Sequence, residues 1–401
     1  MQEMHKKKLI VVLGMHRSGT SAVTRSLKTL GVDLGDALIP AVAGDNDKGF
    51  WEDADTLSIN QDLMAALGVI WCPLSPYDWS KIDAGHLQEF QRQAVELLET
   101  KLRNVDAFGI KDPRLTRLLM FWRPVFERLG VDVRYVLVVR NPLSVAASLK
   151  HRNGFSEFRS LLLWLRHVVP SFLETFGLPR VVVSYERLMA DPKRELRRIA
   201  ASLEVSFDEH SDVFADYAKD FLSPELQHAH HTARDLEQAK DGMVFRLKQI
   251  YEALDGMASD RMQDNDTSAH ELFLNVDRYL ADMADSLIYI DQLEERNDQL
   301  MQLVSPTATD RLAELEIAYD KLTEGQEWLS SQRDAWERLA AERQERITEL
   351  LVVAEECKKG NDWLESERQA WERHAKELQI RVEELSNHTN SIDPGASAER
   401  E

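Results

Sequence analysis

The amino-acid sequence predicts an α/β protein: a parallel sheet flanked by helices, followed by a long α-helical coiled coil. Three observations support this fold class. Short β-branched and apolar runs alternate with helix-period segments through the first half of the chain. The first of these runs is followed by a glycine-rich turn that opens a helix. Toward the end of the chain, apolar residues recur in an uninterrupted heptad pattern.

The predicted strands are short runs of mainly apolar residues, and they lie at 9–13, 107–110, 134–139 and 180–184. Runs that are apolar on both faces are typical of parallel strands covered by helices on both sides. Helical periodicity occurs between them, at 86–102 and 156–176. A further helix is predicted at 191–203, with Asp191 as its N-cap and Pro192 at its first helical position.

The turn after the first predicted strand reads GMHRSGTSAV over residues 14–23. Gly14 and Gly19 have the spacing of the two glycines of a P-loop, but the lysine that normally follows the second glycine is absent. We expect the backbone N–H groups of residues 17–20 and the next helix N-terminus to bind one anion. Three side chains add donors: Arg17, Thr20 and Ser21. The sheet is therefore predicted to be P-loop-like, and these donors suffice for a sulfuryl group, which carries less charge than a γ-phosphoryl group, without a metal ion.

A second motif follows the third predicted strand, in the sequence RYVLVVRNPLSVAASL. Arg140 lies at the carboxyl end of this strand, which is the edge where open α/β sheets bind ligands. Ser148 falls about two helical turns further on. An arginine presents a planar fork to phosphate oxygens and a serine adds a hydroxyl donor, so this pair is predicted to bind a second anion.

Together the two motifs resemble those of the sulfotransferase superfamily, whose members use 3′-phosphoadenosine 5′-phosphosulfate (PAPS). The chain is most similar to the bacterial, carbohydrate- and tyrosylprotein-like branch whose loop reads R-S-G-T-S. The resemblance covers about residues 8–215 and includes the closing strand-helix unit at 181–205. It implies that Arg140 and Ser148 hold the 3′-phosphate. It also implies that the loop holds the 5′-phosphosulfate, through Arg17, Ser18, Gly19, Thr20 and Ser21.

The chain departs from the cytosolic relatives in two respects. Their loop lysine is Arg17 here, and their C-terminal R-K-G-x-x-G segment is missing, so no residue is assigned to the adenine. Tyr185 lines the cofactor site in one interpretation and is a structural tyrosine in the other. Lys111, in FGIKDPRL, is predicted to stabilise charge on the bridging oxygen together with Arg17, because it ends a strand and related branches have a similar Lys-Asp-Pro segment.

The predicted general base is Glu52, in DKGFWED. The neighbouring Phe50 and Trp51 are expected to give this carboxylate a partly dry environment, which raises its pKa toward neutrality. Related branches also draw a glutamate base from the segment after the loop helix. Three other side chains remain alternatives for the base: Asp53, His16 and Asp112.

The last part of the chain is predicted to be a coiled coil with a strict heptad pattern from Leu315 to Leu385. It contains an internal repeat, in which residues 325–350 recur at 360–385 with an offset of 35 residues, or five heptads. We expect it to form a homo-oligomer, a dimer or a trimer, and to present the repeated tryptophans to a possible protein partner. The predicted organisation is a sulfotransferase domain (1–215), a helical and irregular linker (216–285), the coiled coil (286–388) and a disordered tail (389–401).

Charge is distributed unevenly along the chain. Residues 1–215 contain 28 Lys and Arg against 27 Asp and Glu, whereas residues 216–401 contain 21 against 42. The acidic second part argues against nucleic acid as the main partner.

The cysteines, Cys72 and Cys357, have no disulfide or zinc spacing, which favours a cytoplasmic protein. No apolar run is long enough to span a membrane. A membrane-peripheral location through a partner stays open.

The leading interpretation is a PAPS-dependent sulfotransferase that modifies an acceptor hydroxyl, on a glycan or glycolipid precursor by family analogy, with no metal cofactor. One alternative is a P-loop kinase using Mg-ATP, with Asp112 placed like a Walker B acid. The absent loop lysine and the Arg140–Ser148 pair oppose it. The other alternative is a coiled-coil scaffold with a degenerate nucleotide domain. The joint presence of Arg17, Lys111, Arg140 and Ser148 opposes that one.

Overall fold

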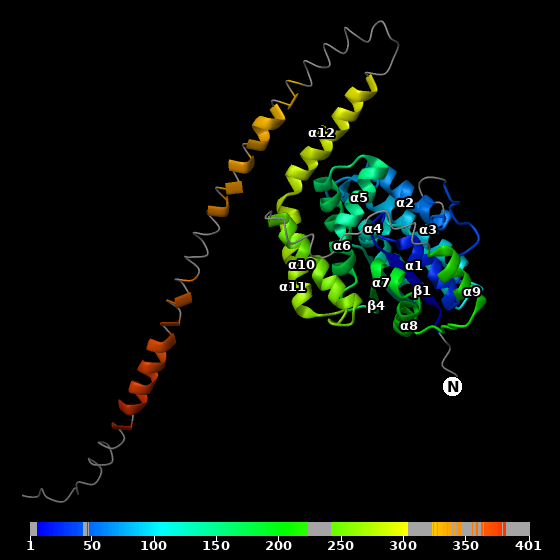
Figure 1. Ribbon diagram of the computed structural model, residues 1–401. Helices are drawn as coiled ribbons and strands as arrows, with labels where there is room; N and C mark the ends of the chain where they lie inside the picture. The colour runs from blue at the N-terminus through cyan, green and yellow to red at the C-terminus, as the bar shows by residue number, and fades with distance from the viewer. Residues whose placement is uncertain are drawn as a thin grey trace, which may run out of the picture. The chain divides into compact units, whose positions relative to one another are not determined.

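The protein is represented by a computed structural model that describes residues 6–42, 46, 48–222 and 242–303, and scattered positions between 323 and 381. It consists of two units, Met1–Asp298 and Gln299–Glu401. The first unit contains the sheet and every residue predicted for the site (Figure 1). The described positions from 323 to 381 are helical. The heptad pairing, and hence the coiled coil, stays a prediction, and the tail at 389–401 lies outside the described residues.

The sheet has four described strands, all parallel, in the order β2-β1-β3-β4. The strands are β1 (Lys8–Leu13), β2 (Ala107–Lys111), β3 (Asp132–Val139) and β4 (Arg180–Ser184). They coincide with the four predicted runs, and the prediction of a parallel sheet flanked by helices is confirmed. Strand β3 begins earlier than predicted, at Asp132, because that residue pairs in register with Lys8 of β1.

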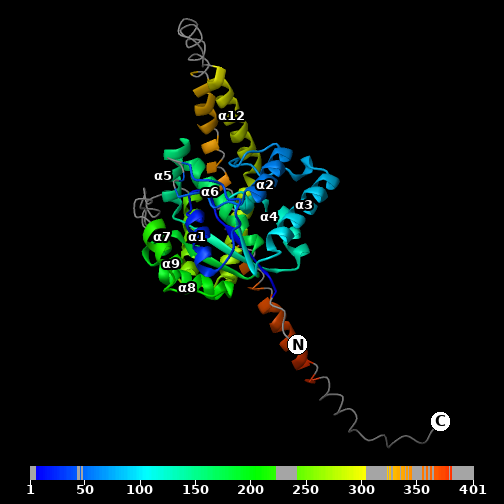
Figure 2. The same cartoon turned by 90° about the vertical axis from the view of Figure 1, so that its right-hand side faces the viewer.

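Helices follow each strand and cover both faces of the sheet (Figures 1 and 2). In chain order the helices of the first part are α1 (Thr20–Leu27), α2 (Ala54–Leu67), α3 (Ala84–Leu102), α4 (Leu115–Leu129), α5 (Pro142–Asn153), α6 (Glu157–Glu174), α7 (Tyr185–Ala190), α8 (Pro192–Leu203) and α9 (Asp212–Asp216). Three further helices are α10 (Gly242–Ala258), α11 (Thr267–Asp282) and α12 (Ala284–Leu303). As predicted, Asp191 caps α8 through the N–H of Arg194, and Pro192 is its first residue.

Alternate side chains of β1 enter two separate hydrophobic cores, as the pleat of a strand requires. Leu9, Val11 and Leu13 face the larger core, which is built with α3, α4, α6, α10 and α11. Ile10 and Val12 face the smaller core, built with α1, α8 and α9. Both faces of the strand are fully buried, which explains why its sequence is a continuous apolar run rather than an alternating one.

The sheet unit extends beyond residue 215. In the segment predicted as a linker, α10 and α11 pack into the larger core, where Leu247, Ile250 and Phe273 are completely buried. The ring of Phe273 stacks on Phe172 of α6 with centroids 3.8 Å apart. The compact unit therefore ends at Asp298, within α12. Polar residues lie between these apolar positions, so the sequence alone does not mark the buried faces of α10 and α11 as part of the core.

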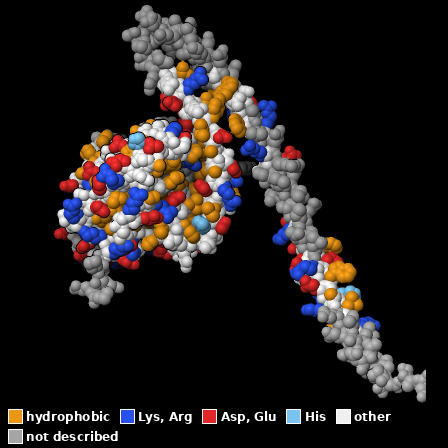
Figure 3. Space-filling model, turned by 180° about the vertical axis from the view of Figure 1, so that it is seen from behind, with side chains coloured by type: hydrophobic (Ala, Val, Ile, Leu, Met, Phe, Trp, Pro, Cys, Tyr) orange, Lys and Arg blue, Asp and Glu red, His pale blue; other side chains and the backbone are white. Residues whose placement is uncertain are grey.

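The surface of the first unit carries charges of both signs, interspersed on the face seen in Figure 3. Within the described parts of the chain, no helix combines the length and the apolar composition needed to cross a bilayer. The predicted acidic bias begins after residue 215, and the helices α11 and α12 share it.

Candidate active site

The predicted site residues converge at one edge of the sheet because all four strands are parallel. Strand β1 leads into Gly14 and the loop, and β2 ends at Lys111. Strand β3 is followed by Arg140, and β4 is followed by Tyr185, the first residue of α7. The carboxyl ends of neighbouring parallel strands lie side by side, which is where open α/β sheets bind ligands.

The loop between β1 and α1 has a tight shape that depends on Gly19. This residue is the N-cap of α1 and has a φ of +85°, in the region that favours glycine. A Cβ atom added here would lie 2.1 Å from Cδ2 of Tyr185, so the tyrosine ring rests directly on the loop. Arg17 also has a positive φ, +67°, and such strain in a non-glycine residue is concentrated at functional sites.

The loop is suited to an anion. The first N–H groups of any helix lack intrahelical acceptors, and none of the described side chains caps the N-terminus of α1. The first turn of α1 contains no acidic residue. The hydroxyl of Ser18 is buried, with the residue 1% exposed, and has no hydrogen-bond partner among the described residues. An anion in the loop would satisfy these donors.

The second predicted motif meets the loop. Nε of Arg17 donates a hydrogen bond of 2.8 Å to Oγ of Ser148, and Nη1 of Arg140 donates one of 3.0 Å to the carbonyl oxygen of Arg17. The guanidinium of Arg140 lies over the ring of Tyr185, 4.7 Å from its centroid. The structure therefore brings together Arg17, Arg140, Ser148 and Tyr185, which come from three separate parts of the sequence: the loop after β1, the segment after β3 and the start of α7.

A second cluster surrounds Lys111. Its Nζ donates to Oε1 of Glu52 at 2.8 Å, to the carbonyl oxygen of Phe50 at 2.8 Å and to Oγ of Ser21 at 3.4 Å. The Ser21 hydroxyl also donates to the Phe50 carbonyl, and Nδ2 of Asn46 donates to Ser21. Lys111 thus connects Glu52, the predicted base, to Ser21 in the first turn of α1.

Glu52 is 6% exposed, and burial raises its pKa above the ordinary value of a glutamate. The charge of Lys111 opposes this shift, whereas the nearby Asp112 carboxylate reinforces it. The guanidinium of Arg114 lies 3.8 Å from Oε2 of Glu52. A carboxylate with a raised pKa beside two cations has the properties of a general base in a partly dry site.

Two of the alternative bases have structural partners. Asp53 is the N-cap of α2, accepting from the N–H of Thr56 at 2.9 Å, and its other oxygen pairs with Lys101 at 2.7 Å. Asp112 accepts from Asn60 at 2.8 Å and from the N–H and guanidinium of Arg114. These partners account for the burial of both carboxylates.

His16 is the third alternative. Its ring lies against Trp71, with centroids 4.3 Å apart, and Nε2 has no hydrogen-bond partner among the described residues. Burial is the main reason that its pKa is well below the ordinary value of a histidine, and the nearby His167 and Arg114 add to the shift. The ring is therefore neutral and a weaker base than an unperturbed imidazole.

Sequence reasoning missed Arg114, Asn46 and Trp71 as residues of the site. Arg114 could have been found, since it follows the Lys-Asp-Pro segment directly. Asn46 and Trp71 lie in irregular segments and have no local pattern that marks them. In the described residues, no group of three or more His, Cys, Asp or Glu side chains is arranged to hold a metal ion.

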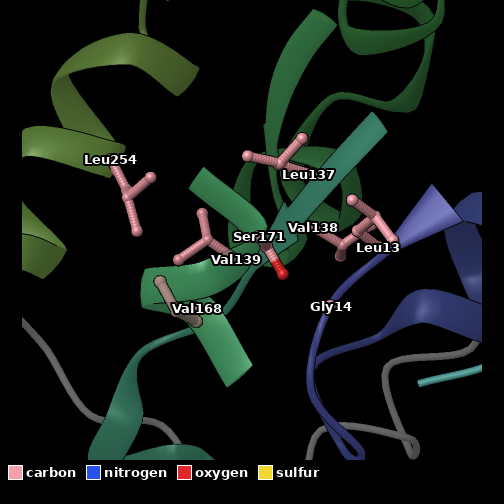
Figure 4. Close-up of a pocket in the computed structure, with 8 residues that line it drawn as sticks. All are labelled: Leu13, Gly14, Leu137, Val138, Val139, Val168, Ser171 and Leu254. Atoms are coloured by element: carbon pink, nitrogen blue, oxygen red, sulfur yellow. The ribbon is translucent and has the colours of Figure 1, made fainter. Parts of the chain in front are cut away.

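A small cavity adjoins the first residue of the loop (Figure 4). It lies where β1 and β3 end, beneath α6 and α10, and its lining is almost entirely apolar. The lining residues are Leu13, Gly14, Leu137, Val138, Val139, Val168, Ser171 and Leu254. A Cβ at Gly14 would lie 2.8 Å from the carbonyl oxygen of Val138, so this glycine allows the loop to pass close to β3.

Residues 10–209 match the model of a family described as the Sulfotransferase family. The match reaches all four described strands and includes every residue predicted for the site. This part of the chain, about half of it, therefore belongs to a sulfotransferase family, and it lies within the compact unit Met1–Asp298.

Two solved structures are similar to the chain. The first is the sulfotransferase domain from the Synechococcus PCC 7002 olefin synthase, at 16% identity and a TM-score of 0.37, over 63% of this chain and 98% of that one. The second is the sulfotransferase domain from the curacin biosynthetic pathway, at 14% identity and a TM-score of 0.37, over 61% and 96%. Among curated proteins, no sequence matches this one.

Proposed function

We propose that the sheet domain transfers a sulfuryl group from PAPS to the hydroxyl of an acceptor. The observation that carries this proposal is the meeting of the two anion-binding motifs. Arg17 of the loop bonds to Ser148, and Arg140 bonds to the backbone of Arg17. One ligand with two anionic groups, such as an adenosine with a 3′-phosphate and a 5′-phosphosulfate, fits a site of this kind better than a single phosphate does.

The donor is held by backbone and side chains together. The N–H groups at the start of α1 and the Ser18 hydroxyl face the sulfuryl and 5′-phosphate oxygens, with side-chain donors from Arg17, Thr20 and Ser21. Arg140 and Ser148 bind the 3′-phosphate, and the Tyr185 ring supports both Gly19 and Arg140. When Arg17 engages the donor, it exchanges its bond with Ser148 for bonds with the ligand.

Transfer is a displacement at sulfur. The acceptor oxygen bonds to sulfur, and the bond between sulfur and the bridging oxygen of the 5′-phosphate breaks. Glu52 accepts the acceptor proton, for which its raised pKa is suited. Negative charge develops on the leaving phosphate oxygen, where Lys111, Arg17 and the loop N–H groups stabilise it. The products are the sulfated acceptor and adenosine 3′,5′-bisphosphate.

The Lys111–Glu52 ion pair has a definite consequence for this step. With the acceptor absent, the cation keeps the buried carboxylate ionised by offsetting the cost of burial. When the base becomes protonated, Lys111 loses its anionic partner and its charge is available to the leaving group. The same side chain thus supports both ends of the reaction.

The acceptor side of the proposal rests on the family. Within the carbohydrate- and tyrosylprotein-like branch, a glycan or glycolipid precursor is the acceptor class we propose. The heptad region is proposed to join copies of the chain into a dimer or trimer, with the repeated tryptophans available to a protein partner. A cytoplasmic location is supported by Cys72, which is a buried free thiol.

Calorimetric titration tests the donor assignment directly. We expect adenosine 3′,5′-bisphosphate to bind without Mg²⁺, because Arg17, Arg140 and the loop supply the positive charge. Binding of Mg-ATP in preference to the bisphosphate would replace the proposal by a kinase. Failure of both ligands to bind would favour a scaffold whose nucleotide domain is inactive.

A further inference from the structure

An irregular segment beside the site, residues 71–77, is held by side chains from distant helices. Arg117 of α4 donates to the carbonyl oxygens of Pro73 at 2.5 Å and Ser75 at 2.6 Å, and its guanidinium lies over the ring of Tyr77 at 4.2 Å. The segment contains no strand or helix that would fix its backbone. Its position is therefore set by these side-chain contacts.

Asp291 of α12 provides the other anchor. Its two carboxylate oxygens accept from the N–H groups of Leu74 at 2.9 Å and Ser75 at 2.8 Å. Arg159 of α6 joins the same group, because it donates to the carbonyl oxygen of Cys72 at 2.8 Å and lies 3.8 Å from Asp291. A carboxylate that accepts from two adjacent backbone N–H groups fixes the direction of the segment at that point.

Trp71 connects this segment to the donor loop. Its ring lies 4.3 Å from that of His16, the residue before Arg17 in the loop, and 5.9 Å from the ring of Phe155, on which it stacks. The guanidinium of Arg159 lies over the other ring of this pair, 5.0 Å from the centroid of Phe155. The rings of His16, Trp71 and Phe155 thus form a wall beside the loop, and Arg159, which anchors segment 71–77 at Cys72, also contacts this wall at Phe155.

We propose that Asp291 is a positioning residue. It holds segment 71–77, and with it Trp71, so that the aromatic wall shields the bound sulfuryl group from water. This inference rests on the proposed function. Asp291 does not touch the donor; it acts through the backbone of Leu74 and Ser75 and through Trp71. Because α12 continues past Asp298 into the second unit, the same helix carries the anchor and the start of the predicted coiled coil at 286–388.

The proposal predicts that PAPS is hydrolysed by water at a higher rate when the wall is loosened. Without an acceptor, water can attack sulfur: its oxygen bonds to sulfur, the bond to the bridging phosphate oxygen breaks, and a proton is released. The products are sulfate and adenosine 3′,5′-bisphosphate. Loosening the wall by Asp291→Ala should raise this hydrolysis of PAPS several-fold and leave the affinity for adenosine 3′,5′-bisphosphate unchanged. A general loss of structure would lower both.

The experiment compares the full-length protein with Asp291→Ala and with Asp298→Ala, a control at an exposed aspartate on the same helix. Hydrolysis of PAPS is followed by release of the bisphosphate, and amide exchange of residues 71–77 is followed by mass spectrometry. Exchange at Leu74 and Ser75 should accelerate by about tenfold or more in Asp291→Ala only, since hydrogen bonds to charged groups are the stronger ones. Trp71→Ala should raise hydrolysis as well. Trp79→Ala should not, because this partly buried tryptophan lies outside segment 71–77.

The outcomes separate the two proposals. Unchanged amide exchange in Asp291→Ala would overturn the claim that Asp291 anchors segment 71–77. Accelerated exchange with unchanged or lower hydrolysis of PAPS would overturn the claim that the wall shields the sulfuryl group from water. If Asp291→Ala does not fold, Asp291→Asn takes its place in both measurements, and Trp71→Ala takes its place in the hydrolysis measurement. If the wild-type protein binds no adenosine 3′,5′-bisphosphate, the proposed function fails and the shield with it, while the exchange measurement still decides the anchor.

Discussion

The two sides of the proposed site, which are the donor side around the loop and the acceptor side around Glu52 and segment 71–77, are built in different ways. The donor side consists of backbone and short side chains at the ends of adjacent strands, with Gly19 pressed against Tyr185 and Arg140 reaching the carbonyl oxygen of Arg17. The acceptor side consists of a buried ion pair, Lys111 with Glu52, and of irregular chain tied down by long side chains. The sheet itself fixes the first, whereas individual side-chain contacts fix the second.

Because of this difference, the fold determines the donor side of the proposed site, whereas the acceptor side can vary in sequence. A donor site built on strand ends cannot change without changing the sheet, so it suits a co-substrate that stays the same across a family. Irregular segments held by a few contacts tolerate substitution far better, and binding specificity commonly resides there. We therefore expect substitutions on the two sides to affect different measured quantities.

Glu52→Gln tests the acceptor side with the largest expected effect. The amide keeps the size of the side chain and removes the base, so turnover should fall by about 10²- to 10⁴-fold. The affinity for adenosine 3′,5′-bisphosphate should stay the same, because Glu52 bonds to Lys111 and not to the donor loop. Steady-state kinetics and calorimetry on the same preparation check both parts. A variant with full turnover would remove Glu52 from its assigned role.

Arg140→Ala tests the donor side. Removing the guanidinium should weaken binding of adenosine 3′,5′-bisphosphate by about 10- to 100-fold, the amount expected for the loss of charge-assisted hydrogen bonds. Arg140→Lys keeps the charge but not the planar fork, so its affinity should lie between those of the wild type and Arg140→Ala. Calorimetry measures both, with thermal melting as the control for folding. Equal affinity in all three proteins would separate Arg140 from the donor.

Much of the donor side could be predicted from the sequence, because its signals are local. A strand followed by a glycine turn and a helix places the loop, and an arginine directly after a strand must lie at the carboxyl edge of the sheet. The contact between Arg17 and Ser148 then follows from β1 and β3 being neighbours. The sequence also predicted all four strands and the capped start of α8.

The acceptor side could be predicted only in part. The aromatic neighbours of Glu52 suggested a buried carboxylate, and the structure places it there. The anchor at Asp291 has no local signal, since it is separated from Leu74 by 217 residues and lies in a helix with many acidic residues. Contacts over such separations depend on the packing of α10 and α11, which a mainly polar sequence conceals.

The pH dependence of turnover tests how the acceptor side controls Glu52. A base works only when ionised, and burial raises the pKa of Glu52, so kcat/KM should fall on the acid side at a pH above that of an ordinary carboxyl group. The charge of Lys111 lowers this pKa, and Lys111→Met should therefore move the acid limb to higher pH as well as slow the reaction. A pH–rate profile of both proteins is the measurement. A limb that moves to lower pH in Lys111→Met would contradict the electrostatic role of the lysine.

Asp53→Ala is expected to have the smallest effect and to distinguish two adjacent carboxylates. Asp53 caps α2 and pairs with Lys101, so its loss should lower the free energy of unfolding by about 1–2 kcal/mol, as for other N-cap residues. Turnover per folded molecule and donor affinity should remain unchanged, because among the described residues the side chain of Asp53 bonds to Thr56 and Lys101 and not to Lys111 or the loop. Denaturant unfolding and kinetics at low temperature separate the two quantities. If Asp53→Ala kept its stability and lost turnover while Glu52→Gln stayed active, the base would lie at the next residue, and the ion pair with Lys111 would be structural.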